Sequence, residues 1–139
     1  MIYKEIVASL DNIEEVSEYL NRLLPDSVIL FLVGDLASGK TTLTQAIAKS
    51  KGIINMVSSP TFSLQHCYGD NLFHYDLYRI ENSHFMELGL FEEFEKGGWH
   101  IIEWGNARLK EFLLSVGYTL YTVTIIPYKE KRKYIIESN

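Results

Sequence analysis

The apolar positions of the chain predict strands that alternate with helices. Val28–Val33 and Trp99–Trp104 are largely apolar at consecutive positions, which is typical of strands buried on both faces of a parallel sheet. Apolar residues recur at helical spacing between Asp11 and Pro25, and again over Lys40–Lys51. The pattern therefore predicts that buried strands alternate with amphipathic helices along the chain.

The remaining segments complete an α/β pattern. Asp11, followed three residues later by Glu14, predicts a capping box at the first helix. Gly69-Asp70-Asn71 predicts a tight turn between two strands, and the chain is expected to end in a β-hairpin. We expect further strands over Ile2–Ala8, Phe62–Tyr68, Leu72–Tyr78, Tyr118–Ile126 and Arg132–Glu137, short helices within Glu81–Phe94, and a helix over Asn106–Leu114. This order predicts one three-layer α/β domain over residues 1–139, with a mostly parallel central sheet and antiparallel hairpins.

Composition narrows the class of protein. The chain has 139 residues, 47% of them apolar and 22% charged, which is the balance of a folded globular domain. Its net charge of −5 argues against general nucleic-acid binding, which depends on neutralising phosphates. No apolar run approaches the ~20 residues that cross a membrane, and the start lacks a signal-peptide pattern. With a single cysteine, Cys67, expected to be a small buried residue, we expect a cytoplasmic protein.

The segment Gly34–Thr41 carries the clearest chemistry. Its sequence, GDLASGKT, matches the phosphate-binding loop pattern G-x-x-x-x-G-K-[ST] completely. The glycines allow backbone N–H groups to surround phosphates, and the helix that follows directs its positive end at them. In this pattern Lys40 contacts the β- and γ-phosphates and the Thr41 hydroxyl binds Mg²⁺.

Two carboxylates occur where buried strands end. Glu103 follows Trp99-His100-Ile101-Ile102 and Asp76 follows Phe73-His74-Tyr75. Ligands of open α/β sheets bind at such strand ends, so both are candidates for metal or water chemistry. Each also has a structural alternative: Glu103 as the cap of the helix at Asn106, and Asp76 as an ion-pair partner of Arg79.

Other polar residues have simpler interpretations. We interpret His74, which lies among aromatic residues, as a packing residue with its hydrogen bonds satisfied, in preference to a catalytic residue. The remaining histidines show no metal-ligand spacing with one another or with Cys67. Arg132 belongs to the basic stretch Lys129–Lys133, which either protects a sheet edge or brings Arg132 near the base of a bound nucleotide or near an RNA.

Four strings together resemble one family. They are GDL-x-x-GKTT at Gly34–Thr42, SPTF at Ser59–Phe62, HYDLYR at His74–Arg79 and IEW at Ile102–Trp104. In this order, and over nearly the whole chain, they resemble the bacterial tRNA threonylcarbamoyladenosine biosynthesis ATPase family (TsaE, also called YjeE).

The resemblance implies a P-loop NTPase fold and a cytosolic ATPase that uses ATP and Mg²⁺. It implies two partners, TsaB and TsaD, which hold the tRNA while this chain activates or resets them. It also implies that Lys40 holds phosphates, that Thr41 and Glu103 hold Mg²⁺, and that Asp76 supports hydrolysis. The nucleotide contacts that we assign in full are Gly34, Asp35, Leu36, Ala37, Ser38, Gly39, Lys40, Thr41, Thr42, Thr61, Trp104 and Arg132.

One departure and one alternative accompany this resemblance. The family usually has Gly-Ala where this chain has Ala37-Ser38, so Ser38 adds a hydroxyl that could contact phosphate or a partner.

The alternative function is a P-loop small-molecule or nucleoside kinase. Such kinases usually clamp the transferred phosphate with several arginines on a lid, whereas the four arginines here are widely spread. A GTP-dependent switch would need the guanine-reading string Asn-Lys-x-Asp, which this sequence lacks.

Overall fold

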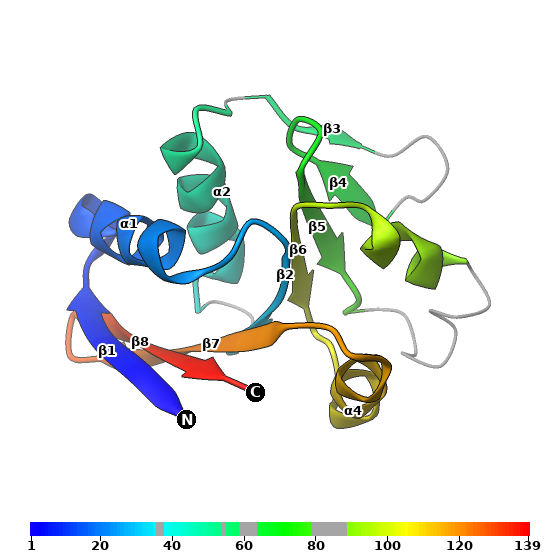
Figure 1. Cartoon of the computed structure of the whole chain (residues 1–139). Helices are drawn as coiled ribbons and strands as arrows, with labels where there is room; N and C mark the ends of the chain where they lie inside the picture. Colours follow the sequence, from blue (N-terminus) through cyan, green and yellow to red (C-terminus); the bar gives the residue numbers. More distant parts are fainter. Residues whose placement is uncertain (36–37, 54, 59–63, 79–88) are drawn as a thin grey trace.

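The computed structural model describes residues 1–35, 38–53, 55–58, 64–78 and 89–139. Within these residues, eight strands form one sheet in the order β1-β8-β7-β2-β6-β5-β4-β3 (Figure 1). The strands are β1 (Ile2–Ala8), β2 (Val28–Val33), β3 (Val57–Ser58), β4 (Gln65–Cys67), β5 (Leu72–Asp76), β6 (Trp99–Glu103), β7 (Leu120–Tyr128) and β8 (Lys131–Ser138).

The centre of the sheet is parallel and its two sides are antiparallel. Strand β2 pairs in parallel with β7 on one side and with β6 on the other, and β6 continues in parallel to β5. The pairs β1–β8, β7–β8, β4–β5 and β3–β4 are antiparallel. The prediction of a mostly parallel central sheet with antiparallel hairpins is therefore confirmed, including the hairpin at the end of the chain.

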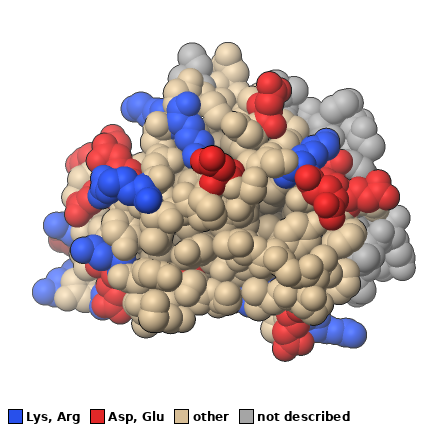
Figure 2. Space-filling view, in the orientation of Figure 1, with Lys and Arg blue, Asp and Glu red and all other residues tan. Residues whose placement is uncertain are grey.

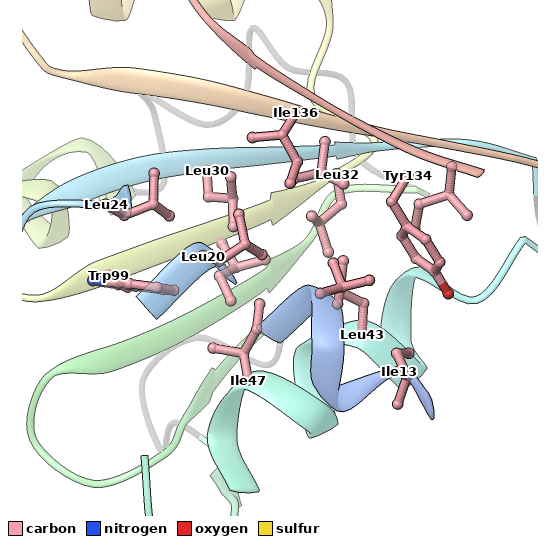
Figure 3. Packing of buried hydrophobic residues seen from close by; sticks show 14 of the residues in the cluster. Ile13, Leu20, Leu24, Leu30, Leu32, Leu43, Ile47, Trp99, Tyr134 and Ile136 are labelled. Carbon is pink, nitrogen blue, oxygen red and sulfur yellow. The ribbon is translucent and has the colours of Figure 1, made fainter. Parts of the chain in front are cut away.

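Helices cover both faces of this sheet, which makes three layers (Figure 1). Helices α1 (Glu14–Leu23) and α2 (Lys40–Ser50) lie on one face and α4 (Ala107–Val116) lies on the other. Figure 3 shows residues of the first core, including Leu20, Leu43 and Ile47 of the helices together with Leu30 and Leu32 of β2. A second core includes Phe31, Phe73, Tyr75, Ile102 and Leu113. Strand β2 is apolar without alternation because it contributes to both cores.

The predicted start of the first helix is wrong. The chain forms a short 3₁₀ turn, η1 (Leu10–Asn12), before α1 begins at Glu14. The Ser9 N–H donates to Asn12 Oδ1 at 2.8 Å, so Ser9 and Asn12, rather than Asp11 and Glu14, make the cap. This cap closes a separate turn, and the long helix follows it.

Several other boundaries differ from the prediction. Strand β4 covers only Gln65–Cys67, with Cys67 half-buried rather than buried, while Phe62 lies outside the described residues. The pattern missed β3, which has two residues. Of the predicted short helices within Glu81–Phe94, the described part is a 3₁₀ helix, η2 (Leu90–Glu95).

Figure 2 shows charged side chains of both signs across the upper part and along the left side of one face, with a broad uncharged area below them. Lys and Arg groups alternate there with Asp and Glu groups instead of gathering into one basic stripe. Among the described helices, none is long and apolar enough to cross a membrane.

Candidate functional site

The candidate site begins where β2 passes into α2. Strand β2 ends at Val33, Gly34 and Asp35 follow, and Gly39 caps α2. Gly39 has a φ of 100°, a backbone conformation that favours glycine. At Gly34, an added Cβ would lie 2.5 Å from Ser38 Oγ. Both glycines of the motif are therefore required by the geometry, whereas Leu36 and Ala37 lie outside the described residues.

Lys40 is buried inside this loop. Its Nζ donates to the carbonyl oxygens of Gly34 and Asp35, at 2.5 and 3.2 Å. Burial lowers the pKa of Lys40, and the negative charges of Glu103, Asp35 and Asp76 oppose this shift. Because Lys40 is the first residue of α2, its amino group lies near the N-terminus of this helix. The helix dipole favours an anion at the same place.

Trp104 covers the lysine. It follows β6 with a φ of 64°, which is unusual for a bulky residue and typical of functional sites. Lys40 Nζ lies 3.8 Å from the centre of the Trp104 ring, and the Tyr78 ring packs against the indole at 4.9 Å. The structure therefore brings Trp104 and Lys40 together, as expected of two site residues.

Glu103 is held at the carboxyl end of β6 and is 4% exposed. Its Oε2 accepts a hydrogen bond from Thr41 Oγ1 at 3.2 Å and is also bonded to His74 Nε2. The capping alternative for Glu103 is wrong, because the Asn106 side chain caps α4 by accepting from the Leu109 N–H. The two residues that we expected to bind Mg²⁺, Thr41 and Glu103, are thus in direct contact.

Asp76 lies at the end of the neighbouring strand. It is the register partner of Glu103 across β5 and β6, so the two carboxylates meet at one edge of the sheet. Asp76 is exposed, and its Oδ1 accepts from the Tyr78 N–H at 3.0 Å. Its alternative partner, Arg79, lies outside the described residues, as does Thr61.

His74 is buried, as expected of a packing residue, and its ring is hydrogen-bonded to Glu103, a contact that the sequence did not predict. The His-x-Asp spacing places His74 and Asp76 on the same side of β5, where His74 reaches Glu103. That spacing was the available signal, and the aromatic neighbours obscured it.

Arg132 reaches the loop from the terminal hairpin. A Cβ added at Gly39 would lie 3.2 Å from the Arg132 guanidinium carbon. Next to it is a cavity of about 320 Å³ lined by Ser9, Ser38, Pro127 and Arg132, among others. Thr42, by contrast, lines a larger groove of about 680 Å³ between α1 and α2, so its side chain belongs to that groove.

A glycine-rich turn between a buried parallel strand and a helix, with a buried lysine beside two carboxylates, defines a P-loop nucleotide-binding protein. A solved structure supports this fold. The crystal structure of YdiB from Bacillus subtilis aligns with a TM-score of 0.64 and 23% identity, covering 100% of this chain and 88% of that one.

Sequence comparison gives the family. The model of the family described as threonylcarbamoyl adenosine biosynthesis protein TsaE matches residues 7–134, and the chain belongs to this family. Its members take part in tRNA threonylcarbamoyladenosine biosynthesis.

Two proteins named tRNA threonylcarbamoyladenosine biosynthesis protein TsaE illustrate the relationship. One, from Bacillus subtilis, is 42% identical over 81 residues, which is 56% of this chain and 51% of that protein. The other, from Treponema pallidum, is 35% identical over 109 residues, which is 76% of each. The chain thus spans about half the length of the Bacillus relative and three quarters of the Treponema one.

Proposed function

We propose that this protein binds ATP with Mg²⁺ and hydrolyses it, slowly alone and faster with its partners, to activate or reset a TsaB–TsaD complex. The observation that carries the proposal is the contact between Thr41 at the start of α2 and Glu103 at the end of β6. This contact joins the phosphate loop to the acidic edge of the sheet in a single site.

The phosphate part of the proposal rests on Lys40. Its amino group now donates to the loop carbonyls of Gly34 and Asp35. A β- or γ-phosphate would offer negatively charged acceptors instead, and the ammonium is attracted more strongly to an ionised oxygen than to a neutral carbonyl. Exchange of these partners would favour triphosphate binding at the start of α2.

The cavity beside Arg132 suits the remainder of a nucleotide. Its volume of about 320 Å³ is at the lower end of small-molecule sites, and Ser38 connects it to the loop. Leu10 and Pro127 offer apolar contacts for a base, and Ser9 and Arg132 offer polar ones. We therefore assign this cavity to the base and ribose.

The site also fits Mg²⁺. The Thr41 hydroxyl and the Glu103 carboxylate are the oxygen donors that this ion prefers, and Mg²⁺ is usually held by one or two carboxylates plus substrate phosphates. When bound, the ion would neutralise charge that develops on the phosphates.

Asp76 is the group we assign to water. It is exposed, it is adjacent to Glu103 in the sheet, and its carboxylate can accept a hydrogen bond from an attacking water. The dependence on partners follows from the family role and from the net charge of −5, which favours partners rather than this chain as the holders of tRNA.

Calorimetry tests the nucleotide site. We expect Lys40→Ala to lose ATP binding and Lys49→Ala, an exposed lysine in the last turn of the same helix, to retain it. ATP binding that survives Lys40→Ala would refute the assignment of the loop. A phosphate-release assay with and without TsaB and TsaD tests hydrolysis: Asp76→Asn should bind ATP and hydrolyse it poorly, and full turnover would exclude Asp76.

A further inference from the structure

His74 and Glu103 form a buried pair, of which the proposed function uses only Glu103. His74 is 5% exposed and Glu103 is 4% exposed, and His74 Nε2 is bonded to Glu103 Oε2. His74 comes from β5 and Glu103 from β6, so the bond connects two parallel strands at their carboxyl ends. A buried carboxylate needs such partners, because burial of an uncompensated charge is costly.

The direction of this bond follows from the chemistry of the two groups. An ionised carboxylate can only accept hydrogen bonds, so the shared proton lies on His74 Nε2 whether the imidazole is neutral or charged. The same oxygen, Oε2, also accepts the Thr41 hydroxyl proton. One carboxylate oxygen therefore receives two donors, from β5 and from α2.

This arrangement leaves Thr41 ready to bind a cation. Because its proton points to Glu103, the lone pairs of the Thr41 oxygen are free to face the phosphate side of the loop. Asp76, the register neighbour of Glu103, repels the Glu103 charge and cannot replace His74 as a donor. Lys40 is occupied by loop carbonyls. Within the described part of the chain, Thr41 and His74 are the two donors to Glu103.

The geometry assigns His74 the role of a positioning residue for the Mg²⁺ site. It holds Glu103 in the orientation that orders the Thr41 hydroxyl, and it does not itself contact nucleotide or metal. Outer partners of this kind typically change metal affinity by about 10–100-fold when they are removed. The inference rests on the proposed function, because it concerns the Mg²⁺ that accompanies the nucleotide.

A pair of nearly isosteric variants tests the role. His74→Gln keeps an N–H donor at a reach similar to Nε2, whereas His74→Met fills similar space without a donor. Calorimetry would measure ADP affinity in MgCl₂ and in EDTA, and the ratio of the two dissociation constants is the Mg²⁺-dependent gain. We expect His74→Met to reduce this gain by about tenfold or more and to leave the affinity in EDTA within about twofold of wild type. His74→Gln should keep most of the gain.

Tyr75→Phe is the matched control. Tyr75 is the next residue of β5, and its buried hydroxyl bonds to His100, away from Glu103. This variant should lower the melting temperature while the Mg²⁺-dependent gain stays unchanged, which separates loss of stability from loss of positioning.

The outcomes are distinct. An unchanged gain in His74→Met, or an equal loss in the Gln and Met variants, would overturn the positioning role. If His74→Met does not fold, the His74→Gln variant decides the question. Loss of the Mg²⁺-dependent gain in His74→Gln would overturn the positioning role, and retention of the gain would support it. Absence of any Mg²⁺-dependent gain in the wild type would instead refute the proposed function.

Discussion

Ser38 offers a direct test of the loop, because its hydroxyl has no hydrogen-bond partner among the residues that the structure describes. The residue is 6% exposed. Ser38 also lines the cavity beside Arg132. We therefore expect Ser38→Ala to stabilise the nucleotide-free protein and to weaken its binding of nucleotide.

The magnitudes follow from the cost of an unsatisfied buried group. A buried hydroxyl without a partner costs about 1–3 kcal/mol, so its removal should raise the free energy of unfolding by about 1 kcal/mol. For a chain of 139 residues, that corresponds to a rise in melting temperature of about 2–5 °C. A hydrogen bond from Oγ to a phosphate would contribute about 1.5 kcal/mol or more to binding, so its loss should weaken affinity about tenfold.

Thermal unfolding without nucleotide and calorimetric titration with ATP measure the two effects. Ser115→Ala is the control, because the exposed Ser115 hydroxyl donates to the Phe112 carbonyl at 2.7 Å and lies in α4, away from the loop. It should change both quantities little. A Ser38→Ala variant that melts at a lower temperature than wild type would show that the hydroxyl is hydrogen-bonded before nucleotide binds, and would refute the reasoning.

Three further predictions concern His100, Tyr75 and Trp104. Burial lowers the pKa of His100 below its ordinary 6.5, so the unfolded chain takes up a proton that the folded chain does not. The free energy of unfolding in urea should therefore fall as pH decreases below about 6.5. His100→Gln should make this dependence on pH weaker. Equal urea midpoints at pH 5.5 and 7.5 in the wild type would contradict the prediction. Tyr75→Phe removes the hydroxyl that bonds to His100 at 2.8 Å and should lower the free energy of unfolding in urea by about 1–3 kcal/mol. Tyr118→Phe removes an exposed hydrogen bond and should lower it less. Equal losses in the two variants would exclude the buried bond as the cause. Nucleotide that draws Lys40 away from the Trp104 ring should change tryptophan fluorescence, and an identical change in Trp104→Phe would show that this contact is not the reporter.

Strands and helices with strong local patterns could be predicted from the sequence. Ile2–Ala8 and Val28–Val33 are the observed limits of β1 and β2, because both segments have residues suited to a sheet and end at clear changes of pattern. The start of the first helix could not be predicted in the same way. Asp11 satisfies a capping pattern, but Asn12 is close enough to Ser9 to close a separate turn first. Both caps are short-range hydrogen bonds between polar residues three positions apart. The sequence pattern alone does not show which of the two forms.

The sequence by itself determined the phosphate loop, because Gly34, Gly39, Lys40 and Thr41 lie within one short segment of the chain. Their spacing alone places the backbone N–H groups, the amino group and the hydroxyl that phosphate binding needs. Only the tertiary structure decided which distant residues complete the site. Glu103 lies 62 positions from Thr41, and the sheet order that places β6 beside β2 brings them into contact. The contact between His74 and Glu103 was decided in the same way. It depends on the neighbouring strand, and strand pairing is a property of the whole sheet.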